Sequence, residues 1–153
     1  MSDTRIKVST KIKASPGRVF DILATPQKHP QTDASGMVLS DANTSPITKV
    51  GQVFRMNMKG ADGSARYQTD NHVTAYKPSR VIAWRTAPAD GEPLGWEWRY
   101  ELALTKKGKT EVTLTYDWTG TSAENLRKYD VPTFSAEDLE ASLAHLKASL
   151  TDD

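Results

Sequence analysis

The sequence has no cysteine, no long apolar run and almost no net charge, and each absence excludes a class of protein. Without cysteine there is no disulfide framework, thiolate nucleophile, zinc ribbon or iron–sulfur cluster. No stretch approaches the roughly 20 apolar residues that span a bilayer, and the first residues lack an apolar run of signal-peptide length. The net charge of +1 provides no field that would gather nucleic acid or acidic lipid. We therefore expect a cytoplasmic protein that binds no nucleic acid and does not insert into a membrane.

The length of 153 residues fits a single domain that spans residues 1–153. A folded chain of this size buries about 68–70% of the surface that its extended form exposes, so a core forms without disulfides or metal. We expect residues 151–153 to be a disordered tail, and the protein to be a monomer or a homodimer.

Alternation of apolar and polar residues predicts seven strands. In residues 5–13, Ile6, Val8 and Ile12 lie on one side of an extended chain and polar residues on the other, which is typical of a half-buried strand. Turn-forming residues rather than helices separate the later strands, so sequential strands are expected to pair antiparallel. The six later strands are expected near residues 36–41, 51–59, 66–76, 80–87, 95–105 and 109–118.

Helical spacing is confined to short segments and the C-terminus. Pro16 after a serine predicts a helix start, and Pro26 ends this helix and begins a second short one. One helical turn is expected near residues 123–129. Ser135, with Asp138 three residues later, resembles a capping box at the start of a long helix. The expected fold class is therefore α+β: a curved seven-stranded antiparallel sheet gripping a long C-terminal helix, with two short helices after the first strand.

One helix is too narrow to cover such a sheet. Strands about 4.8 Å apart make a sheet roughly 30 Å wide, whereas a helix is about 10–12 Å across. The sheet must curl around the helix, and the interior is then either filled by large side chains or hollow. This alternative decides whether the protein can hold a ligand, and the sequence leaves it open.

Two hairpins indicate which residues face the interior. A three-residue turn with Gly108 in the left-handed region would place Tyr100 opposite Leu114 and Trp98 opposite Tyr116, on one face. A four-residue loop would reverse the face of the last strand.

The hairpin that turns at residues 77–80 pairs Val73 with Trp84 and places Asn71 opposite Thr86. In residues 53–59 the apolar residues are expected inside and Arg55 in solvent, although the sequence also allows the two faces of this strand to be exchanged. The residues expected to line a cavity and contact a ligand are Phe54, Met56, Tyr67, Asn71, Val73, Trp84, Trp98, Tyr100, Leu114, Tyr116, Leu139, Leu143 and Leu146.

Several segments, taken in this order, resemble the SRPBCC superfamily of START-like, birch-pollen-allergen-like helix-grip proteins, and in particular its bacterial polyketide cyclase/dehydrase-related branch. They are Ala-Ser-Pro at 14–16, Val-Phe-Asp at 19–21, Trp84, residues 98–102 and residues 115–118. The resemblance covers residues 5–150 and implies a curved sheet around a C-terminal helix and a hydrophobic ligand cavity. These segments mark packing positions, so the resemblance says little about activity.

Catalytic and metal-binding patterns are sparse. His29, His72 and His145 are far apart in the sequence and none has a second ligand at metal-binding spacing, so we expect no metal and no cofactor. His29 is a candidate general base, with Tyr67 as its companion acid, because histidine titrates near neutral pH. The interpretation we favour is a histidine whose ring bonds to nearby backbone. The polar residues Tyr67, Asn71, Tyr100 and Tyr116 either orient a ligand or bond to one another.

Three functions compete. The leading hypothesis is the binding of a small hydrophobic molecule, such as a lipid, polyketide or aromatic metabolite, between the sheet and the last helix. The second is an aromatase/cyclase-type enzyme, a lyase without metal or nucleotide cofactor, in which His29 and Tyr67 move protons. The third is an interaction protein that resembles the heat-shock chaperone activators and uses an exposed sheet face.

Overall fold

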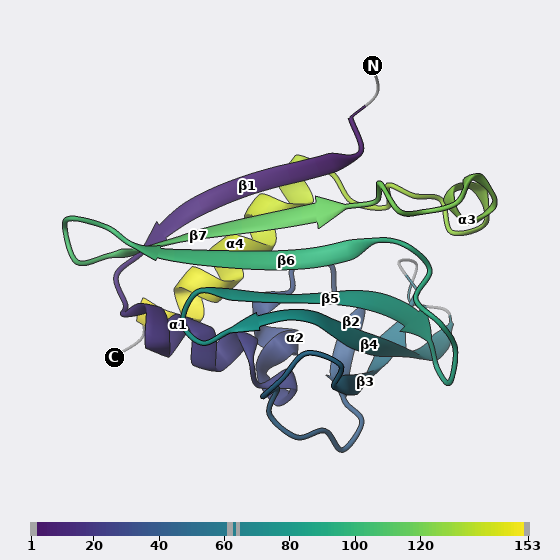
Figure 1. The fold of residues 1–153 in the computed structure, drawn as a ribbon, viewed down its shortest axis with the longest axis horizontal. Helices are drawn as coiled ribbons and strands as arrows, with labels where there is room; N and C mark the ends of the chain where they lie inside the picture. Colours follow the sequence, from purple (N-terminus) through teal and green to yellow (C-terminus); the bar gives the residue numbers. More distant parts are fainter. Residues whose placement is uncertain (1–2, 61–62, 64, 152–153) are drawn as a thin grey trace.

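The computed structural model describes residues 3–60, 63 and 65–151. It contains one seven-stranded antiparallel sheet in the order β1-β7-β6-β5-β4-β3-β2, and a long helix at the C-terminus (Figure 1). The strands are β1 (Arg5–Ile12), β2 (Val38–Asp41), β3 (Val53–Lys59), β4 (Arg66–Lys77), β5 (Val81–Pro88), β6 (Glu97–Leu104) and β7 (Thr110–Asp117). The helices are α1 (Pro16–Leu23), η1 (Pro26–Lys28), α2 (His29–Thr32), α3 (Ala123–Lys128) and α4 (Ala136–Thr151). The predicted α+β fold class is confirmed.

The helix ends follow the local signals in the sequence. The Ser15 side chain accepts a hydrogen bond from the backbone N–H of Arg18 at 3.3 Å, and Pro16 occupies the first turn of α1. At the start of α4, Ser135 N donates to Asp138 Oδ2 at 2.8 Å and Asp138 N donates to Ser135 Oγ at 3.3 Å. This reciprocal pair is the predicted capping box. α4 includes Thr151, and residues 152–153 of the expected tail lie outside the described residues.

The hairpin registers place the aromatic residues on the inner face. Gly108 has a φ of +75°, and Tyr100 pairs with Leu114 and Trp98 with Tyr116, as the three-residue turn predicts. The four-residue alternative is therefore wrong. In β3, Phe54 is buried and Arg55 lies on the opposite face. The apolar residues of this strand therefore face the interior, as expected.

A β-bulge in β4 is the irregularity that strict alternation does not predict. Val73 pairs with Trp84, but Ala75 already pairs with Ala83, so β4 has one extra residue at this point. The bulge brings Tyr76 to the inner face, where the ring of Phe20 from α1 packs edge-on against it at 5.5 Å. α1 therefore covers this end of the sheet.

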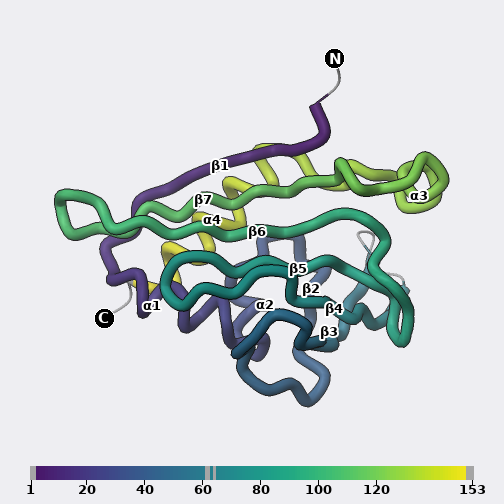
Figure 2. The backbone as a smooth tube through the Cα atoms, viewed as in Figure 1, coloured from purple at the N-terminus to yellow at the C-terminus, as the bar shows by residue number. Residues whose placement is uncertain are grey.

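α4 runs obliquely across the concave face of the sheet, behind β1, β7 and β6 in the view of Figure 2. It packs against β1 and against α2, and Leu143, Leu146 and Leu150 are buried in the same core as Ile12. In the described part of the chain, no helix combines the length and apolarity needed to cross a membrane.

Candidate functional site

A cavity of about 560 Å³ lies between the concave face of the sheet and the first two turns of α4. Its walls also include α2, the segment that leads to β2, and the segment between α3 and α4. This volume falls within the roughly 300–1,000 Å³ that is usual for small-molecule sites. The interior that the sequence left undecided is thus hollow at one end.

Most of the residues predicted to contact a ligand line this cavity. They are Phe54, Met56, Tyr67, Asn71, Trp84, Trp98, Tyr100, Leu114, Tyr116 and Leu139, together with the candidate base His29.

Val73, Leu143 and Leu146, which were predicted to contact a ligand, are not among the residues that line the cavity. All three are buried, with exposed fractions of 2% or less. Leu143 and Leu146 follow Leu139 along one face of α4, but there the helix is packed against β1 and leaves no open space. Val73 lies at the bulge, next to the end of the sheet that α1 covers.

The prediction missed the part of the wall that irregular chain supplies. Tyr129, Thr133 and Phe134 line the cavity from the segment around the end of α3 and the start of α4, which has no periodicity to read. Trp96 also lines the cavity. It is two residues from Trp98, so the alternation of the strand could have predicted its place in the wall.

Aromatic rings form two contact groups in the walls. Trp84 stacks on His29 with ring centroids 5.1 Å apart, and Phe54 meets both rings edge-on. Trp98 stacks on Tyr116 at 4.3 Å, with Phe134 edge-on to both. Such contacts hold large rings in defined orientations, so the wall presents flat, apolar faces.

His29 is bonded to backbone and also faces the cavity. Its Nε2 lies 2.7 Å from the carbonyl oxygen of Leu23, and because a carbonyl can only accept, Nε2 carries the proton. Burial lowers the pKa of His29 to about 4, against the smaller raising effects of this hydrogen bond and of Asp33. The imidazole is therefore neutral at pH 7. Nδ1 holds a lone pair and has no hydrogen-bond partner among the described residues.

Tyr100 has a similarly open polar atom. The residue is 8% exposed, lines the cavity, and its hydroxyl has no hydrogen-bond partner within the described part of the chain. Burial, with a smaller contribution from the charge of Asp33, raises the pKa of this phenol, so it remains a hydrogen-bond donor. Asp33 also lines the cavity and accepts a hydrogen bond from Ser35 Oγ at 2.5 Å.

Two further buried polar residues of the lining, Asn71 and Tyr116, are bonded within the protein. Asn71 Nδ2 donates to the Phe54 carbonyl and to Thr69 Oγ1, both at 3.3 Å, and Asn71 Oδ1 accepts from Thr86 at 3.2 Å. The Tyr116 hydroxyl accepts from the backbone N–H of Thr133 at 3.2 Å.

Tyr67, the predicted companion acid, is 40% exposed at the edge of the cavity. Partial burial raises the pKa of its phenol.

A close backbone approach holds α3 beside the cavity. Gly95 has a φ of +126°, and a Cβ atom there would lie 2.5 Å from Thr121 Cα, so only glycine fits. Asn125 Nδ2 then donates to the carbonyl of Leu94 at 3.1 Å, which ties α3 to a residue of the lining. The ring of Trp96 contacts Tyr129 at 5.7 Å on the same side.

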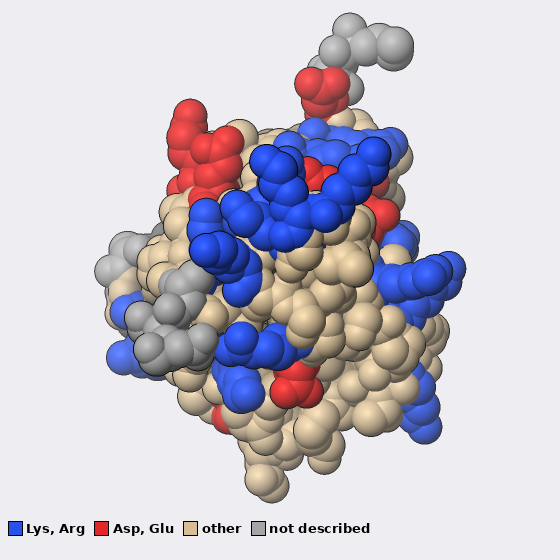
Figure 3. All heavy atoms as spheres, turned by 90° about the vertical axis from the view of Figure 1, so that its left-hand side faces the viewer, with Lys and Arg blue, Asp and Glu red and all other residues tan. Residues whose placement is uncertain are grey.

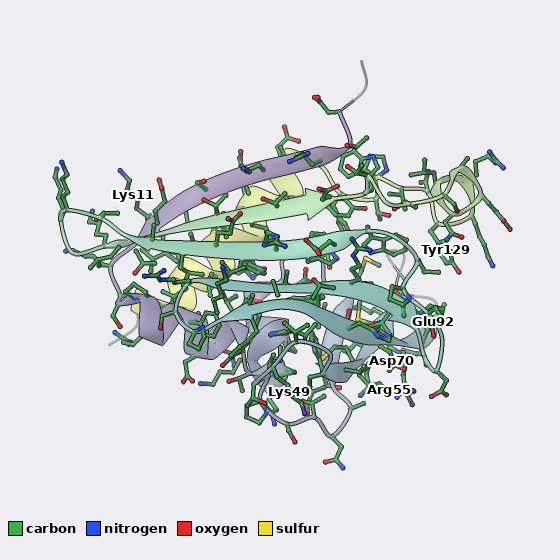
Figure 4. All side chains as sticks on the ribbon, viewed as in Figure 1. Lys11, Lys49, Arg55, Asp70, Glu92 and Tyr129 are labelled. Carbon is green, nitrogen blue, oxygen red and sulfur yellow. The ribbon has the colours of Figure 1, made fainter. Side chains whose placement is uncertain are left out.

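Arg55 was predicted to lie in solvent, but its guanidinium is bonded to two carboxylates. It is on the outer face of the sheet, where Nε and Nη2 donate to the Asp70 carboxylate at 2.8 and 3.0 Å, and Nη2 donates to Asp90 at 2.7 Å (Figure 4). Hydrogen bonding to Arg55 lowers the pKa of Asp70. The cluster joins β3, β4 and the turn after β5, and it stabilises the sheet behind the cavity.

Comparison with known proteins identifies the family. The profile of the family described as "Polyketide cyclase / dehydrase and lipid transport" matches residues 3–151. The uncharacterized protein Rv0088 of Mycobacterium tuberculosis is 31% identical over 147 residues, which cover 93% of this chain and 62% of that protein. The chain thus spans less than two thirds of the length of the curated relatives it matches.

Solved structures share the fold at low identity. Protein Ms6760 from Mycobacterium smegmatis superposes with a TM-score of 0.71 at 16% identity, covering 97% of this chain and 91% of that chain. The Aha1 dimer from Colwellia psychrerythraea gives a TM-score of 0.60 at 20% identity, covering 97% and 96%. Such identities establish the fold alone. Because the family profile matches nearly the whole chain, this protein belongs to the polyketide cyclase/dehydrase and lipid transport family, within the SRPBCC superfamily that its sequence resembles.

Proposed function

We propose that this protein binds a small, mostly apolar molecule in the cavity between the sheet and α4. The observation that carries the proposal is the open volume of about 560 Å³, walled largely by aromatic and aliphatic side chains. Enclosing apolar surface contributes about 25 cal/mol per Å², so a ligand of drug-like size gains affinity without strong polar contacts. The family description, which includes lipid transport, supports this function.

The shape of the walls favours a ligand that contains rings. Trp84 and Trp98 lie on adjacent strands β5 and β6 and pair directly with one another in the sheet register. Both line the cavity and both belong to stacked ring groups. A flat aromatic or polycyclic body therefore finds matching faces, whether the ligand is a polyketide or another aromatic metabolite.

Binding of the neutral dye Nile red tests the proposal. We expect saturable enhancement of dye fluorescence with quenching of the cavity tryptophans, and displacement of the dye by apolar competitors. Ala141→Trp places a large ring at a lining position on α4 and should weaken dye binding. Ala144→Trp is the matched control, because Ala144 is exposed on the same helix and does not line the cavity. No saturable binding by the unmodified protein, or equal loss in both variants, would contradict the proposal.

An aromatase/cyclase-type activity is the second candidate, because His29 presents a neutral nitrogen to the cavity and Tyr100 a phenolic donor. Burial makes His29 a weak base, which limits proton abstraction near pH 7. The test is loss of water from 4-hydroxy-4-phenylbutan-2-one to the conjugated enone, followed by ultraviolet absorbance. A rate above buffer that falls in His29→Gln favours the enzyme, and a rate equal to buffer favours binding alone.

No specific observation favours the interaction-protein hypothesis. The large apolar residues that are exposed come from several elements: Leu39 from β2, Val50 and Val53 before and in β3, Tyr67 from β4 and Leu104 from β6.

A further inference from the structure

Among the described polar residues of the lining that are themselves buried, two keep a side-chain atom without a protein partner. Asn71 and Tyr116 have protein partners, whereas His29 Nδ1 and the Tyr100 hydroxyl have none among the described residues. Buried polar groups in proteins are almost always hydrogen-bonded. These two atoms are therefore available to a bound molecule, one as an acceptor and the other as a donor.

The two residues contact the same tryptophan of the cavity wall. The ring centroid of Trp84 is 5.1 Å from that of His29 and 5.9 Å from that of Tyr100. Asp33 lines the same cavity, and its charge contributes to raising the pKa of both side chains. We call His29, Asp33 and Tyr100 the polar corner.

The charge around the polar corner has one sign. Asp33 and Asp138 line the cavity, and no Lys or Arg is among the described residues that do so. Lys and Arg side chains gather instead on the end of the molecule that carries the β6–β7 turn (Figure 3). His29 is buried, bonded through Nε2 to a backbone carbonyl and in contact with the rings of Phe54 and Trp84, and burial keeps it uncharged at neutral pH. A ligand carboxylate would thus be desolvated beside Asp33 without a cation to pair with it.

We propose that the polar corner makes the cavity selective for uncharged ligands that carry a hydroxyl or N–H group on an aromatic body, and that it rejects carboxylates such as fatty acids. The ligand's O–H or N–H donates to His29 Nδ1, and a ligand oxygen accepts from the Tyr100 hydroxyl. This inference rests on the proposed binding function and narrows its ligand class.

Three naphthalene derivatives of similar size separate these contributions in a Nile red displacement assay at pH 7. 2-Naphthol can donate and accept, 2-methoxynaphthalene can only accept, and 2-naphthoate is an anion. One hydrogen bond of about 1.4 kcal/mol corresponds to a tenfold change in affinity. We expect 2-naphthol to bind about tenfold tighter than 2-methoxynaphthalene, and 2-naphthoate to bind at least about tenfold more weakly than 2-naphthol.

Conservative variants assign each effect to a residue. Tyr100→Phe should weaken binding of 2-methoxynaphthalene relative to unsubstituted naphthalene. Tyr76→Phe is the matched control, because Tyr76 packs against Phe20 and does not line the cavity, and it should leave this ratio unchanged. Asp33→Asn should strengthen binding of 2-naphthoate and leave that of naphthalene unaltered.

The outcomes distinguish the two proposals. If Nile red itself fails to bind, the proposed binding function is wrong. If Nile red binds but 2-naphthol does not displace it, or if 2-naphthoate displaces it as well as 2-naphthol does, the selectivity is overturned while the binding function stands. The measurements on the unmodified protein are sufficient for this decision even where a variant does not fold.

Discussion

Acidification should destabilise this protein through one buried side chain. His29 is 7% exposed and packs against Phe54 and Trp84, and burial lowers its pKa to about 4 from an ordinary value of 6.5. Between these two values the unfolded chain binds a proton that the folded chain does not. The free energy of unfolding therefore keeps its full value above about pH 6.5 and decreases as the pH falls toward 4.

The size of the effect follows from the two pKa values. Each tenfold change in proton affinity is worth about 1.4 kcal/mol, so the change from 6.5 to about 4 corresponds to roughly 3 kcal/mol of unfolding free energy. About 2.5 kcal/mol of this should be lost between pH 7.5 and 4.5. Asp70, whose pKa is lowered by its hydrogen bonds to Arg55, contributes a loss only at more acidic pH, because its ordinary pKa is 3.8.

Urea unfolding followed by tryptophan fluorescence at several pH values measures the effect. His29→Gln keeps an N–H group that can donate to the Leu23 carbonyl but does not titrate, so most of the dependence between pH 6.5 and 4 should disappear. His145→Gln is the matched control, because His145 is exposed on α4, and this variant should retain the dependence. An unchanged pH dependence in His29→Gln would refute the reasoning.

Three further substitutions test the packing around the cavity, each by its urea midpoint. Leu146→Ala removes a side chain with no exposed surface and should cost about 2–5 kcal/mol of unfolding free energy. A loss below about 1 kcal/mol would show that the C-terminal half of α4 is not packed as described. Gly108→Ala should cost about 1–2 kcal/mol for its positive φ alone, because its new Cβ atom has no close neighbour. Gly95→Ala should destabilise the protein more, because there the new Cβ atom also meets the backbone of Thr121. Asp70→Asn should cost about 1.5–3 kcal/mol, since it weakens the charged hydrogen bonds from Arg55, and an unchanged midpoint would contradict that contribution.

Much of the fold was predictable because its signals are local. Alternation along the strands, the glycine in the turn at residue 108 and the serine–aspartate pair at 135 and 138 each act within a few residues, and each appears where expected. The hairpin turn in particular sets the register of β6 and β7, which places Trp98 and Tyr100 inside.

The candidate site was only partly predictable, because its shape depends on how distant segments pack. Periodicity places Leu139, Leu143 and Leu146 on one stripe of the last helix, yet only the first of them meets open space. Their difference arises from the oblique path of α4, which closes onto β1 at one end and leaves the sheet uncovered at the other. The irregular segment at 129–134 has no pattern that predicts its place in the wall.

Side-chain partners were the least accessible property. The hydrogen bond between His29 and Leu23 spans six residues and agrees with the favoured expectation of a backbone partner. By contrast, Arg55 meets Asp90 across 35 residues, and the rings of His29 and Tyr100, from two different elements, both contact Trp84. Strand parity and turn geometry thus follow from short-range sterics along the chain, whereas the cavity and its polar corner arise only when the sheet curls and the helix is laid across it.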